Sequence, residues 1–185
     1  FRLTVYDNDV NDATDEILVT VTGPMAIEDI QCPSNLEQGD YCYETPLAGQ
    51  TIITTGIVTA VKPGEYPNFY LQQPSASTCG GIYVFDTSVS PQIGDELIIS
   101  ATVNEYYSFT QLIDVNSSMP ISNGNEINPL SISTGELGIG CTLSGEELES
   151  MLIKVNNVVV RINMAHVKDT AELSRFVNVG HDIFL

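Results

Sequence analysis

Few residues in this chain have the types and spacing that catalysis requires. A nucleophile needs a base beside it, and both histidines, His166 and His181, lie near the C-terminus with no nucleophile motif around them. The G-x-S-x-G elbow and a phosphate-binding glycine loop do not occur in the sequence. With 24 acidic residues, neighbouring carboxylates such as Asp95 and Glu96 arise from composition alone. We therefore expect no catalytic site in this segment.

An acidic turn near the N-terminus carries the oxygen ligands that Ca²⁺ prefers. Asp7, Asp9 and Asn11 have the 1-3-5 spacing of an EF-hand loop. Asp12 stands where that loop needs glycine and Leu18 where it needs glutamate, so the turn is not an EF-hand. Two interpretations stay open, an ordinary polar turn and a looser calcium site. The looser site would consist of Asp7, Asp9, Asp12 and Asp15.

The four cysteines are Cys32, Cys42, Cys79 and Cys141. They show no C-x-x-C spacing, which argues against zinc. An even number of cysteines in an acidic chain rich in strand patterns suits two disulfides and an oxidising compartment. Of the three possible pairings, we favour Cys32–Cys42, which closes a short loop, and Cys79–Cys141. Free thiols are the alternative.

The elements that would position these residues are strands. Runs rich in β-branched residues or alternating in polarity indicate strands. Five such runs occur, and no segment between them has the 3.6-residue period of a helix. Gly56 interrupts the first run, as at a bulge or sharp coil. The five expected strands are Thr51–Val61, Asn68–Gln72, Gly81–Phe85, Glu96–Val103 and Phe109–Val115. This number and order predict an all-β fold, a five-stranded barrel of the OB-fold type.

Aromatic side chains alternate along the second and third expected strands, and more lie in the loop after the fourth. Rings on one face of an OB barrel can stack on bases or sugars. Alternating aromatics also serve as cross-strand packing, and both interpretations stay open. The candidate ligand-binding residues are Tyr70, Gln72, Tyr83, Phe85, Tyr106 and Tyr107.

Several motifs carry a family resemblance. The segments GIVTAV, NFYLQQP, GIYVF, GDEL and EYYSFTQL resemble the OB-fold module of secreted bacterial nucleases, over roughly Ile30–Val160. GEELESML (Gly145–Leu152) is similar to the segment that opens a further β unit in that family, with Ser150 in place of a glycine. In those proteins the module precedes an endonuclease/exonuclease/phosphatase-type catalytic domain, which this segment does not contain.

The flanking regions complete the expected organisation. LTVYDND and DEILVTVT resemble the last hairpin of an immunoglobulin-like repeat, of the polycystic-kidney-disease or cadherin type. We also expect a short strand at Leu130–Ile132, a helix start at Ser144–Glu149, a strand at Met151–Ile162 and a helix at Ala165–Phe176. The expected parts are an immunoglobulin-like hairpin (1–23), a linker with Ile27 and Ile30 pinned to the barrel (24–48), the barrel (49–116), a loop and β unit (117–162) and an atypical tail (163–185).

The charge separates two functional hypotheses. Six Lys and Arg against 24 Asp and Glu give a net charge of −18, and Lys62 is the only basic residue between Arg2 and Lys154. Such a surface opposes non-specific attraction to nucleic acid and suits an extracellular protein; no apolar run reaches the ~18 residues of a membrane span. One hypothesis is an accessory module that presents single-stranded DNA to the catalytic domain of an extracellular endonuclease. The other is a structural or polysaccharide-binding module of an extracellular multidomain protein.

Overall fold

The computed structural model describes residues 23–62, 68–86, 88–137 and 140–155. The N-terminal hairpin with its candidate calcium ligands, the expected helix Ala165–Phe176 and the rest of the tail lie outside the described residues. The short elements are α1 (Ile27–Gln31), β1 (Glu37–Gln38), β2 (Tyr43–Glu44), β8 (Leu130–Ile132), η1 (Thr134–Leu137), α2 (Leu143–Glu146) and β9 (Ile153–Val155). No helix of the described segments has the length and hydrophobicity to span a membrane.

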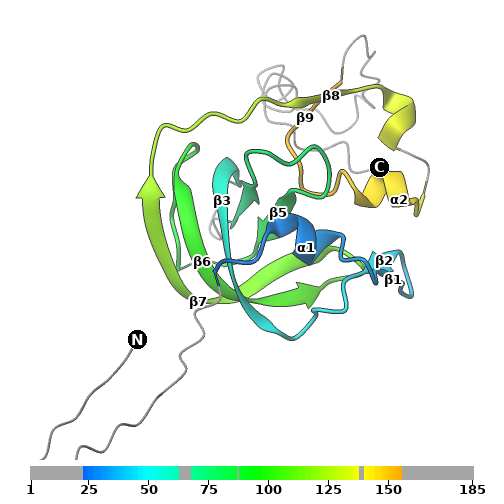
Figure 1. Cartoon of the computed structure of the whole chain (residues 1–185), viewed down its shortest axis with the longest axis horizontal. Coiled ribbons are helices and arrows are strands. Elements are labelled where there is room, and N and C mark those ends of the chain that lie inside the picture. Colours follow the sequence, from blue (N-terminus) through cyan, green and yellow to red (C-terminus); the bar gives the residue numbers. More distant parts are fainter. Residues whose placement is uncertain (1–22, 63–67, 87, 138–139, 156–185) are drawn as a thin grey trace, which may run out of the picture.

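Five strands form a closed barrel (Figure 1). They are β3 (Thr51–Lys62), β4 (Asn68–Gln72), β5 (Gly81–Val84), β6 (Glu96–Glu105) and β7 (Thr110–Ser122). Around the barrel the order is β3-β4-β5-β7-β6, and β6 closes back onto β3. Neighbours are antiparallel except β5 and β7, which are parallel. This is the Greek-key barrel of the OB-fold, and the predicted fold class is confirmed.

The barrel interior follows from the alternation in the sequence. Side chains two residues apart point to the same side of a strand, and Leu97, Ile99, Ala101 and Val103 of β6 are all buried. Phe69 and Leu71 of β4 meet Ile82 and Val84 of β5 in the same core. The hydrophobic effect thus selects the inward face of each strand, and the residues between them form the outer face.

Helix α1 covers the barrel in the segment expected to be a linker (Figure 1). Ile27 and Ile30 are fully buried in the barrel core, as their predicted pinning requires. Gly56 permits this packing, because a Cβ there would lie only 3.0 Å from Ile27 Cδ1. The irregularity expected at Gly56 instead lies between Val58 and Ala60. A side chain at position 56 would therefore crowd Ile27 of α1 as well as Leu71 and Gln72 of β4.

The last barrel strand is longer than the sequence suggested. Strand β7 continues to Ser122, through a segment expected to be loop from Asn116 onward. The short strand β8 is as predicted and pairs in parallel with β9, whereas the strand expected from Met151 begins at Ile153. Helix α2 starts near its expected position, but its cap is Thr142, whose hydroxyl accepts a hydrogen bond from the Gly145 amide at 3.1 Å.

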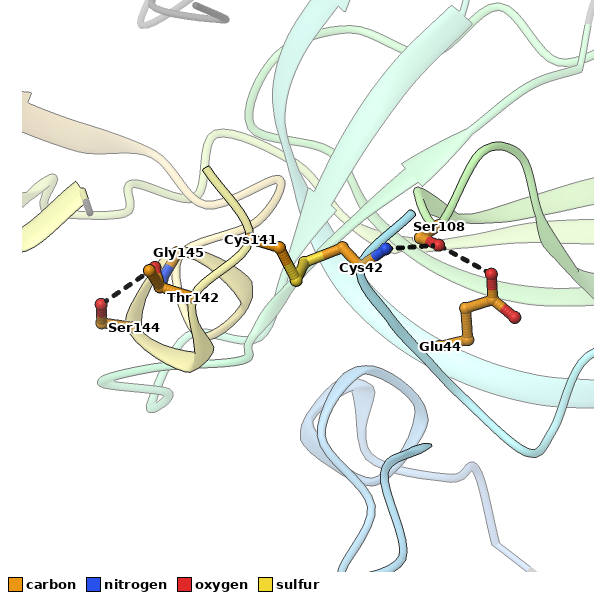
Figure 2. Close-up of a disulfide and its surroundings, with 7 residues drawn as sticks. All are labelled: Cys42, Glu44, Ser108, Cys141, Thr142, Ser144 and Gly145. Atoms are coloured by element: carbon orange, nitrogen blue, oxygen red, sulfur yellow. Dashed lines mark hydrogen bonds between the residues drawn. A yellow bond between two sulfur atoms is a disulfide. The ribbon is translucent and has the colours of Figure 1, made fainter. Parts of the chain in front are cut away.

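Two disulfides join all four cysteines, and the favoured pairing was wrong. Cys32 bonds to Cys79 and Cys42 bonds to Cys141, with Cα separations of 5.8 and 5.1 Å. Cys32 follows α1, which packs beside β5, and Cys79 lies just before that strand. The β1–β2 hairpin carries Cys42 toward the start of α2, where Cys141 lies (Figure 2). The pairing follows from where α1 and the β1–β2 hairpin pack, which the spacing of cysteines along the chain does not encode.

Candidate ligand-binding face

A row of four side chains crosses the outer face of the barrel. Tyr70 of β4 pairs with Tyr83 of β5, and Tyr83 pairs with Gln111 of β7. Gln111 in turn pairs with Asn104 of β6. Strand pairing therefore places two aromatic rings and two amides side by side across four strands. The ligand face of an OB-fold is built on its second and third strands, which here are β4 and β5.

The aromatic half of this row is tightly packed. The Tyr83 ring lies 4.8 Å from that of Tyr70 and 5.5 Å from that of Phe109, measured between ring centroids. Only 8% of Tyr83 is exposed. Burial raises the pKa of Tyr83, against a smaller lowering by a hydrogen bond with Asn68. Tyr83 thus offers a ligand little surface and serves mainly to pack its neighbours.

Beside this row the face is hollowed into a groove of about 370 Å³. Phe85 lies on its wall with half of its surface exposed. The Gln111 amide nitrogen donates to Asn104 Oδ1 at 2.8 Å, which fixes the orientation of both amides. The lining residues are Phe85, Asp86, Asn104, Gln111, Ile113 and Asp114. An exposed ring flanked by amides and carboxylates can stack on a planar or hydroxyl-rich ligand and hydrogen-bond its edge.

Asp86 is held in place at one end of the groove. Its carboxylate accepts hydrogen bonds from the Val115 amide at 3.0 Å and from the amide and hydroxyl of Ser88. Burial opposes ionisation of Asp86, but these hydrogen bonds outweigh it and lower its pKa. The groove therefore has a fixed negative charge at neutral pH.

Gln72 shares the outer face of β4 but does not reach the groove. It is 2% exposed, and its Oε1 accepts a hydrogen bond from the Leu152 amide at 2.7 Å. Its partner across the strands is Gly81, and a Cβ at Gly81 would overlap the backbone of Ser150 and Met151. The chain itself thus covers this end of the face, and Gln72 anchors the covering segment.

Tyr106 and Tyr107 form a separate exposed cluster with Tyr41. The Tyr107 ring lies 4.7 Å from that of Tyr106 and 5.1 Å from that of Tyr41, in edge-to-face geometry. Tyr107 and Ser108 have φ of 55° and 56°. The Ser108 hydroxyl accepts from the Cys42 amide and donates to Glu44, which ties this turn to the disulfide-bonded hairpin (Figure 2).

Sequence reasoning missed Tyr41 and most of the groove. Tyr41 lies far from Tyr107 in the chain, and no local pattern joins them. Alternation does place Gln111 and Ile113 on one side of β7. What it does not show is that β7 lies parallel to β5, which brings Gln111 beside Tyr83. Among the described residues, no group of three or more His, Cys, Asp or Glu is arranged to hold a metal ion.

Comparisons with known proteins give a fold likeness only. No protein-family model matches the chain, and no curated protein matches it. The second OB-fold domain of replication protein A from Methanococcus maripaludis is similar over 43% of this chain and 91% of its own, at 16% identity and a TM-score of 0.33. A protein described as an aspartyl-tRNA synthetase from Leishmania major Friedlin is similar over 60% of this chain and 23% of its own, at 12% identity and a TM-score of 0.39. The OB-fold assignment rests on the barrel topology.

Proposed function

We propose that this chain is a non-catalytic OB-type module of a secreted nuclease, which presents single-stranded DNA to a catalytic domain outside this segment. The observation that carries the proposal is the face across β4, β5, β7 and β6, where an exposed ring and oriented amides border a groove. The motif resemblance to nuclease modules falls on the strands that build this face. Two disulfides support an oxidising, extracellular setting.

The chemistry of the groove determines how DNA would bind. Its lining contains two carboxylates and no Lys or Arg, so phosphates are repelled from it and bases must make the contacts. Stacking of a base on an aromatic ring contributes about 1–3 kcal/mol. We therefore expect weak binding that does not fall as salt rises, unlike binding through phosphate neutralisation.

Fluorescence anisotropy with a labelled single-stranded oligonucleotide tests this proposal. Phe85→Ala should weaken binding about 5- to 160-fold, as expected when one stacking ring is lost, with unchanged thermal stability. Ile93→Ala is the matched control, because Ile93 is also exposed but lies outside the groove. Equal loss in both variants, or no binding from low to high salt, would refute the proposal. Tyr83→Ala is a poorer probe because Tyr83 is buried.

A neutral polysaccharide is the second candidate, and the composition of the groove favours it. A half-exposed ring stacks on the apolar face of a sugar, and amide and carboxylate groups bind sugar hydroxyls. The same anisotropy cell with oligosaccharide competitors separates the two candidates. Displacement of DNA by a neutral oligosaccharide would show a shared site, whereas sugar binding without DNA binding would assign the groove to polysaccharide.

A further inference from the structure

Three glutamates from separate elements meet where the C-terminal unit packs on the barrel. Glu105 ends β6, Glu146 lies in α2 and Glu149 follows it. Glu149 Oε1 accepts from the Gln31 side chain at 2.6 Å and from the Thr110 amide at 3.0 Å. Glu105 Oε1 accepts from the Thr45 amide at 2.9 Å and from the Thr110 hydroxyl at 2.8 Å. The cluster therefore links α1, the barrel and α2.

Within the part of the chain that the structure describes, no Lys, Arg or His is among the groups that bond to or perturb this cluster. The groups that bond or perturb the three carboxyls are amides, hydroxyls and a fourth carboxylate, Glu44 of β2. Glu146 is only 4% exposed, and its Oε1 has no hydrogen-bond partner. Glu105 Oε2 and Gln31 Oε1 are also buried without partners.

The charges of these three carboxylates are therefore neutralised by binding protons. These carboxyls do not form a metal-binding arrangement within the described part of the chain, and buried like charges without counter-ions take up protons. Burial and the charge of Glu105 raise the pKa of Glu146 to about 7. Burial and the charge of Glu146 raise the pKa of Glu149 to about 8, against hydrogen bonds from Gln31 and Thr110. Burial likewise raises the pKa of Glu105.

Two members of the cluster, Glu146 and Glu149, belong to the segment that covers one end of the ligand face. The Glu147 carbonyl accepts from the Cys79 amide at 2.6 Å, and the Leu152 amide donates to Gln72 at 2.7 Å. Between these contacts the backbone of Ser150 and Met151 lies directly on Gly81. Residues 142–152 thus form a strap, which α2 begins and the Cys42–Cys141 disulfide ties to the β1–β2 hairpin.

We propose that residues 142–152 are a proton-latched strap over the outer face of β4 and β5, closed while Glu105, Glu146 and Glu149 hold protons and loosened when all three ionise. The direction follows from linkage. The closed state binds more protons than an open state with solvated carboxyls, so opening is favoured as pH rises from about 4.5 toward 8. Below that window the strap is fully latched.

Hydrogen exchange of the chain with both disulfides formed tests this, with no ligand present. After correction for intrinsic exchange rates, protection of the Leu152 and Cys79 amides should fall about tenfold per pH unit for each proton released between pH 5 and 8. In the variant Glu146→Gln/Glu149→Gln this protection should fall much less over the same pH range, because Glu105 is then the one carboxyl of the cluster that can still ionise. Glu147→Gln, which changes a glutamate outside the cluster, should behave as wild type.

Three outcomes would overturn the proposal. The first is constant protection at Leu152 in the wild type, and the second is the same fall in the Gln variant. The third is an equal loss at the amide of Val103 in the barrel, because that would indicate global unfolding. The first and third comparisons need only the wild type, so they stand even where the double variant fails to fold. None of the three depends on DNA or sugar binding.

Discussion

At the scale of single residues, two side chains on the same outer face differ in exposure because another part of the chain covers one of them. Phe85 and Gln72 both point outward from neighbouring strands, yet Phe85 is half exposed and Gln72 is 2% exposed. The difference comes from Leu152, whose amide bonds Gln72. Ser150, two residues earlier, has a φ of 59° and a buried hydroxyl without a partner. It stands where the resembled nuclease modules have glycine.

Ser150→Gly should stabilise the protein by about 0.5–1.5 kcal/mol. The left-handed conformation costs a non-glycine residue about 1–2 kcal/mol, and the change also removes an unsatisfied buried hydroxyl; the greater freedom of glycine in the unfolded chain offsets part of this gain. Urea unfolding measures the effect. Ser144→Gly, an exposed position in α2, should instead destabilise slightly. A loss of stability in Ser150→Gly would contradict the assignment of strain to this residue.

At the scale of elements, α1 and α2 have five and four residues, far fewer than an isolated helix needs in water. Each depends on packing and on a disulfide. The two disulfides close loops with sequence separations of 47 and 99 residues. One fastens the end of α1 to the segment just before β5, and the other fastens the start of α2 to the β1–β2 hairpin.

Removing either disulfide should cost about 4–5 kcal/mol in the chain-entropy account, slightly more for the longer loop. The double variants Cys32→Ala/Cys79→Ala and Cys42→Ala/Cys141→Ala test this by urea unfolding. The second should also release the strap, so its Leu152 amide should lose protection even at pH 5. An unfolding midpoint equal to wild type in either variant would show that the bridge is not a structural constraint.

At the scale of the whole molecule, a net charge of −18 repels itself in the compact state. Salt screens this repulsion with a Debye length of about 10 Å at 0.1 M. Raising NaCl from 10 to about 200 mM should therefore raise Tm by several degrees, in a rise that levels off as screening saturates. KCl should act equally, since the effect depends on ionic strength. A Tm that is independent of salt would mean that repulsion between the acidic side chains does not destabilise the folded state.

The sequence by itself determined the strands and their inward faces, because alternation and β-branched residues are local properties. All five barrel strands lie within a few residues of their predicted positions, except for the extension of β7 to Ser122. It also identified Ile27 and Ile30 as residues pinned to the barrel, since isolated apolar pairs in a polar segment require burial.

Only the tertiary structure decided which distant residues meet. The parallel pairing of β5 with β7 built the groove, and packing of α1 and the hairpin selected Cys32–Cys79 and Cys42–Cys141. The glutamate cluster arose in the same way, from elements separated by some 40 residues. Closing a long loop changes chain entropy only slowly with its length, so spacing along the chain carries little information about such contacts. They depend on the combined packing of the whole core.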